Sequence, residues 1–395
     1  MQLRISVRPR GVKGAAEPGV ECRLCKVAHK KLTGQAGVFL FTGFPGFIGA
    51  RLIPRLLEMR PASSFRCLVQ EPFEAAARDL LGAIERSQPT ARGRISIVLG
   101  DITQERLGLT AAAAKTLQAE LSGAYHLAAV YDLAVRREVG MRINVLGTRN
   151  VIAFLEGARN LERFDYVSTA YVSGSAVGIY RETDLDVGQS FKNCYEETKF
   201  LAELEVSKSG LPFVTHRPGI VVGDSRTGET GKFDGPYFVL AAMEKAPSPG
   251  IFPRVGSGRN TINLVPVDFV VEALAQLSCA GASLRKTYHL TDPEPLAVSA
   301  VSELFARALG KSYLYAPVPL PLAKLLFTPG PMQRFFGMPV QSVDYFDHPC
   351  RYDASQATAE LARLGVSCPR LPTYLQRLVA FYLEKKGSVR RKAMI

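Results

Sequence analysis

Short apolar runs alternate with stretches of helical periodicity along the first half of the chain. Residues 38–42 form an apolar, strand-forming run that ends in a glycine-rich loop, and apolar residues then recur with helical spacing through 52–57. Strands that alternate with helices favour parallel pairing, so we expect an α/β fold, a doubly wound parallel sheet of the Rossmann type. The further elements predicted are strands over 65–69, 95–99, 124–128, 164–169 and 213–216, and helices over 73–85, 135–158 and 195–209.

The pattern loosens in the second half. Residues 223–260 are rich in Gly, Pro and polar residues, and a strand is predicted over 262–267. Asp268 is the predicted N-cap of a helix over 269–277. Residues 293–384 are mostly helical in pattern, with proline breaks. Four segments follow: a basic, flexible N-terminal extension (1–34), a Rossmann domain (35–222) completed by strands within 262–292, a smaller and mostly helical substrate-binding part (223–384), and a basic tail (385–395).

The formal net charge of +13 is carried by the two ends of the chain. Residues 1–34 hold a net charge of +6 and residues 385–395 hold +5, which leaves +2 for the remainder. Basic ends are typical of solvated tails, with weak contact to anionic lipid as the alternative. We therefore expect no specific nucleic-acid partner, and no more than weak peripheral contact with a membrane.

Compartment and metal content follow from the apolar runs and the cysteines. No apolar run reaches the roughly 18 residues that span a bilayer, and the N-terminus lacks the apolar core of a secretory signal. The seven cysteines are scattered and odd in number, which is typical of reduced thiols. Cys22-x-x-Cys25, with His29 nearby, lacks the second ligand pair of a closed zinc site. We expect a cytoplasmic protein, with peripheral membrane attachment as the alternative, and no bound metal.

Gly43, Gly46 and Gly49 form the loop between the first predicted strand and the first helix. A dinucleotide pyrophosphate needs backbone N–H groups, a helix N-terminus and free space where a Cβ would stand, and a glycine turn here supplies all three. The spacing is one residue longer than the usual dinucleotide fingerprint. The alternative is a tight turn without a ligand, but the position after the first strand favours a cofactor site.

The end of the second predicted strand distinguishes NAD from NADP, because an acid there binds the ribose hydroxyls of NAD. Gln70 is neutral, which removes repulsion against a 2′-phosphate and favours NADPH. Arg66 and Arg78 are candidate partners for that phosphate. Glu71 is the NAD-type acid if the strand ends one residue later, so NAD remains open. Asp101 follows the third strand and is placed to contact the adenine.

Tyr195 and Lys199 are spaced i, i+4 and lie on one face of a predicted helix. A phenol with a pKa near 10 is a poor acid at pH 7, and a nearby ammonium lowers that pKa. Thr169, at the end of the fifth predicted strand, offers a hydroxyl to the same substrate oxygen. Helices carry a lone Y-x-x-x-K by chance, but together with the glycine loop and Ser168-Thr169 the pair predicts a proton-transfer site.

As a set, these residues resemble the extended short-chain dehydrogenase/reductase family over roughly residues 36–300. Residues 217–228 and 265–270 resemble its branch of thioester reductases and fatty acyl reductases, the male sterility type. Gln70 stands where many reductases of this branch carry Arg. The motifs that carry the resemblance are Thr42-Gly43-x-x-Gly46-x-x-Gly49, Asp101, His126-Leu127-Ala128-Ala129, Asn144, Ser168-Thr169-Ala170-Tyr171-Val172, Tyr195-x-x-x-Lys199 and Arg217-Pro218-Gly219.

The resemblance implies an NAD(P)-dependent oxidoreductase and a role for each site residue. Tyr195 is implied as proton donor or acceptor, and Lys199 as the residue that binds the nicotinamide ribose and tunes Tyr195. Thr169 is implied to polarise the carbonyl, and Asn144 to support Lys199 through a water. The implied cofactor-binding set is Thr42, Gly43, Phe44, Gly46, Phe47, Ile48, Gly49, Gln70, Asp101, Ile102, Ala128, Ala129, Tyr195, Lys199 and Pro218.

The expected reaction is reduction of an acyl thioester, on coenzyme A or a carrier protein, to an aldehyde or alcohol. The 395 residues hold no adenylation or carrier domain, so we expect a partner to deliver the thioester. The nearest alternative is a dehydrogenase for a lipophilic secondary alcohol or ketone, such as a 3-hydroxysteroid. A sugar-nucleotide epimerase or dehydratase and a nucleotide sensor without turnover rank behind it. Pairing of two copies through helices near residues 145 and 200 is a family-level expectation.

The remaining candidates have plainer interpretations. His126 is expected to pack at a strand end near the cofactor, and His216, His289 and His348 show no metal-ligand spacing. The apolar stretch 320–336 is expected to pack in a core, with a pocket wall or a membrane-contacting surface as alternatives.

Overall fold

The computed structural model describes residues 36–328 and 339–387 and is built around a parallel sheet. The strand order is β11-β7-β5-β4-β1-β2-β3, and each neighbouring pair is parallel. This order confirms the predicted doubly wound Rossmann fold. The strands of this sheet are β1 (Val38–Thr42), β2 (Ser64–Val69), β3 (Ile95–Leu99), β4 (Leu121–His126), β5 (Arg163–Val167), β7 (Phe213–Pro218) and β11 (Thr287–Leu290).

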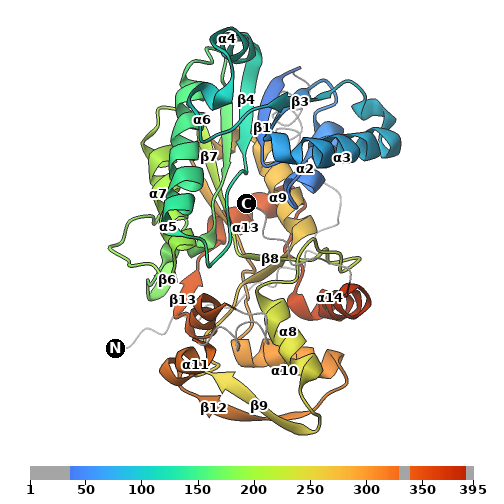
Figure 1. Ribbon diagram of the computed structural model, residues 1–395, viewed down its shortest axis with the longest axis vertical. Coiled ribbons are helices and arrows are strands. Elements are labelled where there is room, and N and C mark those ends of the chain that lie inside the picture. Colours follow the sequence, from blue (N-terminus) through green and yellow to red (C-terminus); the bar gives the residue numbers. More distant parts are fainter. Residues whose placement is uncertain (1–35, 329–338, 388–395) are drawn as a thin grey trace, which may run out of the picture.

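Helices cover both faces of the sheet, as Figure 1 shows. Alternate residues of β1 point to opposite faces: Phe41 enters the apolar core under one layer of helices and Leu40 the core under the other. One layer holds α2 (Gly49–Met59), α3 (Glu74–Ser87), α9 (Val267–Cys279) and α13 (Ser355–Arg363). The other holds α4 (Ala111–Glu120), α6 (Gly147–Glu156) and α7 (Cys194–Lys208), with α5 (Arg137–Gly140) leading into α6.

Helix α13 returns to this sheet from the far end of the chain. Ala357 and Leu361 of α13 are buried in the same core as α2 and α9. The buried carboxylate of Glu182 accepts hydrogen bonds from the backbone N–H groups of Ala357, Gln356 and His289, at 2.8–3.0 Å. A carboxylate at a helix N-terminus is favourable, so Glu182 ties α13 to the edge strand β11.

The rest of the second half packs around a separate apolar core. Leu240, Phe305 and Leu378 meet there from three different helices. These helices are α8 (Pro236–Lys245), α10 (Val298–Ala308) and α14 (Leu371–Lys385), while α11 (Leu320–Phe327) packs in a smaller cluster with the turn Val340–Asp347. Three strand pairs lie outside the main sheet: β8 (Ile220–Val222) with β10 (Leu264–Pro266), β9 (Gly250–Val255) with β12 (Tyr313–Val318), and β6 (Gly178–Tyr180) with β13 (Cys350–Tyr352).

Several helix and strand boundaries near the sheet ends differ from those predicted from the sequence. Strand β4 spans 121–126 rather than 124–128, and β5 ends at Val167, so Thr169 already lies in the loop after the strand. The helix predicted over 135–158 contains a π-helical turn, Met141–Leu146, between α5 and α6. The strand predicted over 262–267 shrinks to β10 and pairs outside the main sheet.

Asp268 is not the N-cap of α9. The helix begins one residue before it, after Pro266, because proline is well suited to the extended residue that precedes a helix. The Asp268 carboxylate instead accepts hydrogen bonds from the backbone N–H and the hydroxyl of Ser225, at 2.9 and 2.6 Å. It thereby ties the 223–235 loop to the start of α9.

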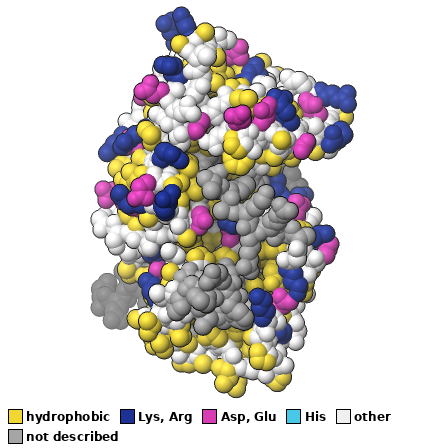
Figure 2. All heavy atoms as spheres, in the orientation of Figure 1, with side chains coloured by type: hydrophobic (Ala, Val, Ile, Leu, Met, Phe, Trp, Pro, Cys, Tyr) yellow, Lys and Arg dark blue, Asp and Glu magenta, His cyan; other side chains and the backbone are white. Residues whose placement is uncertain are grey.

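Apolar side chains gather at the end of the molecule formed by β9, β12 and α11, as Figure 2 shows. The described part of 320–336 packs in a core only in part: Ala323 is buried in a small apolar cluster, whereas Leu325 is 68% exposed and Leu326 is 50% exposed. The other exposed apolar side chains there are Ile251, Leu314 and Leu322. In the described residues no helix combines the length and apolarity needed to cross a membrane.

Several sequence expectations fall outside the described residues. These are the flexible extension 1–34 with Cys22 and Cys25, most of the basic tail, and the remainder of the 320–336 stretch. Within the described residues, no group of three or more potential metal ligands comes together.

Candidate active site

A cavity of about 860 Å³ opens at the carboxyl ends of the sheet strands, where Rossmann folds bind ligands. One side is formed by the glycine loop, the ends of β2, β4 and β5, and the first turns of α7. The opposite side comes from residues 218–239, Ile262 and residues 339–346. The predicted site residues that line it are Thr42, Gly43, Phe44, Gly46, Phe47, Ile48, Gly49, Gln70, Ile102, Ala128, Ala129, Thr169, Tyr195, Lys199 and Pro218.

The glycine loop leaves no room for side chains where a dinucleotide would pass. Gly43 has φ +89°, and a Cβ there would stand 2.9 Å from the backbone nitrogen of Ala128. A Cβ on Gly49 would stand 2.6 Å from the carbonyl oxygen of Gly43. Helix α2 starts directly after the loop and its N-terminus has no side-chain cap. This cradle fits a dinucleotide pyrophosphate, which backbone N–H groups and a helix N-terminus would hold.

A buried chain of hydrogen bonds sets the ends of β1 and β4 beside this loop. The Thr42 hydroxyl lies 2.7 Å from His126 Nδ1 and accepts a hydrogen bond from Ala128 N–H at 3.2 Å. His126 Nε2 lies 3.0 Å from the Thr148 hydroxyl. Burial, with the nearby charge of Lys199, lowers the pKa of His126 to about 3, so the ring is neutral. His126 has the packing role expected of it.

Neither arginine predicted to hold a 2′-phosphate reaches the cavity. Arg78 is directed to Glu74, four residues earlier on α3, and Arg66 to Glu120. A different cation lines the cavity: Arg51, whose guanidinium stacks 4.3 Å from the Phe47 ring centroid. Its position three residues into α2 gave no sequence signal.

At the end of β2, Gln70 lines the cavity, whereas Glu71 is exposed and does not. Asp101 also lies outside the lining, although it was predicted to contact the cofactor. Its carboxylate accepts a hydrogen bond from Thr103 N–H at 2.8 Å. Burial alone would raise the pKa of Asp101, but hydrogen bonds from Thr103, Gln70 and Gln104 outweigh burial and lower it. Asp101 thus orients Gln70.

Thr169 and Tyr195 meet at the cavity wall, as expected from the sequence. Both line the cavity, Thr169 from the loop after β5 and Tyr195 from α7, and Thr169 is close enough to lower the pKa of the phenol. Burial raises the pKa of Tyr195 to about 12, and Thr169 opposes that rise. The phenol is therefore protonated at neutral pH.

Lys199 lines the cavity, and its ammonium is directed to the end of β5 rather than to the Tyr195 phenol. Its Nζ donates to the Tyr166 hydroxyl at 2.9 Å and to the Val167 carbonyl at 2.8 Å. Burial lowers the pKa of Lys199 to about 7, against the opposing charge of Glu203. Because the ammonium is directed to β5 and is partly neutral near pH 7, it does not lower the pKa of Tyr195 as the spacing predicted.

Asn144 lies in the π-helical turn and does not line the cavity. Its Oδ1 accepts from Val130 N–H at 2.9 Å, and its Nδ2 donates to the Val130 carbonyl and the Thr198 hydroxyl, both at 3.0 Å. These bonds hold the loop after β4 to α7. They give Asn144 a positioning role that the sequence did not predict.

A buried ion pair behind the wall was also missed by sequence reasoning. Arg217 donates to Glu203 at 2.6 Å, and both side chains are almost fully buried. Glu203 also accepts a hydrogen bond from the Ser168 hydroxyl. The pair locks β7 and α7 next to Thr169. Glu203 follows Lys199 by four residues, and this spacing alone indicated only weakly that the two side chains share a face of α7.

The opposite side of the cavity is largely apolar, with one charged pair. Lys232 lies 3.2 Å from Asp234 and 4.8 Å from the ring centroid of Tyr131. The apolar lining consists of Phe238, Val239, Ile262, Pro339 and Phe346, joined by Ser342 and Tyr345. Sequence reasoning assigned none of these to the site, because they come from three stretches that only the fold brings together.

Comparison with known proteins places this geometry in a family. The family described as "Male sterility protein" matches residues 41–274. A linear gramicidin synthase polypeptide of Brevibacillus parabrevis is 30% identical over 269 residues, which are 64% of this chain and 5% of that protein. Fatty acyl-CoA reductase wat of Drosophila melanogaster is 28% identical over 274 residues, 60% of this chain and 53% of that protein. The chain thus spans at most about half the length of these relatives.

The fold also matches a solved structure. The terminal R domain from the myxalamid PKS-NRPS biosynthetic pathway superposes with a TM-score of 0.73 and 25% identity. The superposition covers 89% of this chain and 92% of that domain. The likeness therefore includes most of the second half as well as the Rossmann sheet.

Proposed function

The chain belongs to the male sterility protein family of extended short-chain reductases and is an NAD(P)-dependent oxidoreductase, and we propose that it reduces an acyl thioester to an aldehyde or alcohol. One observation carries the proposal: Thr169, Tyr195 and Lys199 line the same cavity as the glycine loop. A proton donor and a dinucleotide cradle are the two requirements for reducing a carbonyl group.

The chain's own residues supply the proton and the alignment. When bound in the glycine cradle, a reduced nicotinamide cofactor supplies a hydride. The Tyr195 hydroxyl donates its proton to the substrate oxygen, since a phenol with a pKa near 12 keeps that proton until charge develops on the oxygen. The Thr169 hydroxyl, which lines the cavity beside the phenol, shares the developing charge. The C–S bond of the reduced carbon then breaks as its hydroxyl loses a proton and the sulfur takes one up, which leaves an aldehyde and a free thiol.

We propose NADPH as the hydride source. Gln70 lines the cavity at the end of β2 while Glu71 points away from it, so the cavity presents no carboxylate there to repel a 2′-phosphate. Arg51 also lines this side of the cavity, where its guanidinium forms an ion pair with Glu229 at 2.9 Å. NADH remains the comparison cofactor in every assay below.

The substrate side supports an acyl chain delivered as a thioester by coenzyme A or a carrier protein. Phe238, Val239, Ile262 and Phe346 form an apolar wall that suits a hydrocarbon chain. The same wall supports the second candidate, a lipophilic secondary alcohol or ketone such as a 3-hydroxysteroid. Both candidate substrates suit this apolar wall, but they undergo different reactions. A turnover assay with each class therefore distinguishes them.

The test is single-turnover oxidation of NADPH with acyl-CoA thioesters of increasing chain length, with product analysis for aldehyde and alcohol. Tyr195→Phe should abolish turnover and leave NADPH affinity unchanged. Tyr315→Phe is the matched control, because its buried hydroxyl has no hydrogen-bond partner among the described residues. Failure of every acyl-CoA, together with oxidation of a steroid alcohol, would replace the thioester proposal with the second candidate.

A further inference from the structure

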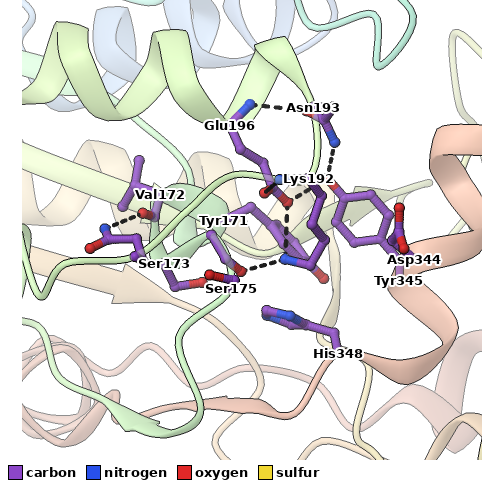
Figure 3. A network of polar contacts seen from close by, with 12 residues as sticks. Tyr171, Val172, Ser173, Ser175, Lys192, Asn193, Glu196, Asp344, Tyr345 and His348 are labelled. Carbon is purple, nitrogen blue, oxygen red and sulfur yellow. Dashed lines mark hydrogen bonds and ion pairs between the residues drawn. The ribbon is translucent and has the colours of Figure 1, made fainter.

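Tyr345, from the turn Val340–Asp347, reaches the N-terminus of the helix that carries Tyr195. Its hydroxyl donates to Glu196 Oε1 at 2.7 Å and accepts from Asn193 Nδ2 at 2.9 Å. Asn193 is the N-cap of α7, and its Oδ1 accepts from Glu196 N–H at 3.0 Å. Figure 3 shows the Tyr345 ring directed at Asn193 and Glu196. The tyrosine thus closes a ring of hydrogen bonds around the first turn of α7.

Lys192 extends this ring to the segment that holds Thr169. Its Nζ donates to the Gly174 carbonyl and lies 3.4 Å from Glu196 Oε1, while its backbone N–H donates to Glu196 Oε2 at 3.0 Å. Gly174 ends the short helical turn that begins directly after Thr169. The network therefore joins both segments that carry the proton-handling residues, and fully buried Glu196 stands at its centre.

The same tyrosine also forms part of the cavity wall. Its ring packs edge-on against Tyr171 at 5.0 Å between centroids, with an interplanar angle of 75°. Tyr171 and Tyr345 both line the cavity. One side chain thus contacts the substrate space with its ring and the helix of Tyr195 with its hydroxyl.

We infer that Tyr345 is a positioning residue that aligns Tyr195 with Thr169 from the substrate side of the cavity. The inference rests on the proposed reductase function. Without the Tyr345 hydroxyl, the first turn of α7 loses its link to the second half of the chain, and Glu196 shifts toward Lys192. A displacement of about 1 Å at reacting groups costs on the order of 100-fold in rate.

The first variant is Tyr345→Phe, which keeps the ring and its contact with Tyr171. We expect kcat to fall roughly 10–100-fold while KM for the thioester and for NADPH stays within about twofold. Tyr315→Phe should change neither constant. A Tyr345→Phe enzyme with wild-type kcat, or one whose KM rises as much as its kcat falls, would overturn the inference.

A second variant, Glu196→Gln, separates positioning from general loss of structure and takes over the test if Tyr345→Phe does not fold. It should also lower kcat with KM unchanged. The double variant should lose no more than the worse single variant, because both changes break one link. If the two losses of kcat multiply in the double variant, or if Glu196→Gln keeps the wild-type kcat, the inference is contradicted.

The assay uses whichever substrate class the wild-type enzyme turns over. If thioesters fail and a steroid alcohol is oxidised, the proposed function fails and the positioning of Tyr195 is still measured on the alcohol. If thioesters are reduced and both variants match the wild type, the positioning inference alone fails.

Discussion

Replacing Asn144 by alanine tests whether this residue positions the cofactor loop. The change removes the two hydrogen bonds with the Val130 backbone and the one with Thr198. Thr198 keeps a partner, because its hydroxyl also donates to the Cys194 carbonyl at 2.7 Å. Val130 is 3% exposed, so its N–H and carbonyl are left buried without the partner that holds them.

The magnitude follows from those two groups. A buried polar group left without its partner costs about 1–3 kcal/mol, so the two at Val130 together cost about 2–6 kcal/mol. The higher helix propensity of alanine offsets roughly 0.5 kcal/mol of this cost in stability. Since folded proteins are stable by about 5–15 kcal/mol in total, the loss is a large share of the whole. Cofactor affinity should fall too, because the loop 128–133 lines the cavity.

Urea unfolding followed by circular dichroism, and fluorescence titration with NADPH, measure both effects. Asn150→Ala is the matched control: its amide donates to the Ile102 carbonyl at 2.8 Å in a half-buried place, and it should cost about 1 kcal/mol. If Asn144→Ala is destabilised no more than the control and binds NADPH normally, the positioning role is refuted. Asn144 would then act, if at all, only through Lys199.

Three further outcomes are expected. The kcat/KM for reduction should fall as pH rises through about 7, because loss of the Lys199 proton weakens its hydrogen bonds to the Tyr166 hydroxyl and the Val167 carbonyl at the end of β5, next to Thr169; a flat profile from pH 5.5 to 9 would contradict this. Gln70→Arg should raise the preference for NADPH over NADH about tenfold through a charge-assisted hydrogen bond, and Gln70→Asp should lower it, as the ratio of the two KM values will show. Gly49→Ala places a Cβ 2.6 Å from the Gly43 carbonyl, so NADPH affinity should drop at least about tenfold and stability by about 1–3 kcal/mol; unchanged binding would argue against the cradle.

The sequence revealed those parts of the site whose signals are local. The apolar run before the glycine loop, and the Tyr195–Lys199 spacing, depend on neighbouring residues, and the structure brings both to one cavity. Arg78 was assigned to a phosphate although Glu74 lies one helical turn away and holds it. The i, i+4 spacing of Glu74 and Arg78 predicts that ion pair.

The parts that could not be predicted depend on distant contacts. Tyr345 lies 150 residues after Tyr195, and no periodicity marks a tyrosine that will bond to the cap of α7. The partners of Asn144 depend on where the loop at Val130 crosses the π-helical turn. The pKa of Lys199 depends on its burial, which exists only in the folded chain.

The return of α13 to the sheet has a consequence for how such enzymes diversify. Because Glu182 binds the start of α13 and Leu361 fills the core beneath the sheet, the scaffold for the cofactor includes residues that follow the substrate wall in sequence. If everything after a single junction were replaced to change the specificity, α13 would be lost as well. The edge strand β11 would then lose the helix that packs against it. Exchange of the substrate half therefore requires at least two junctions, one on each side of the segment to be replaced.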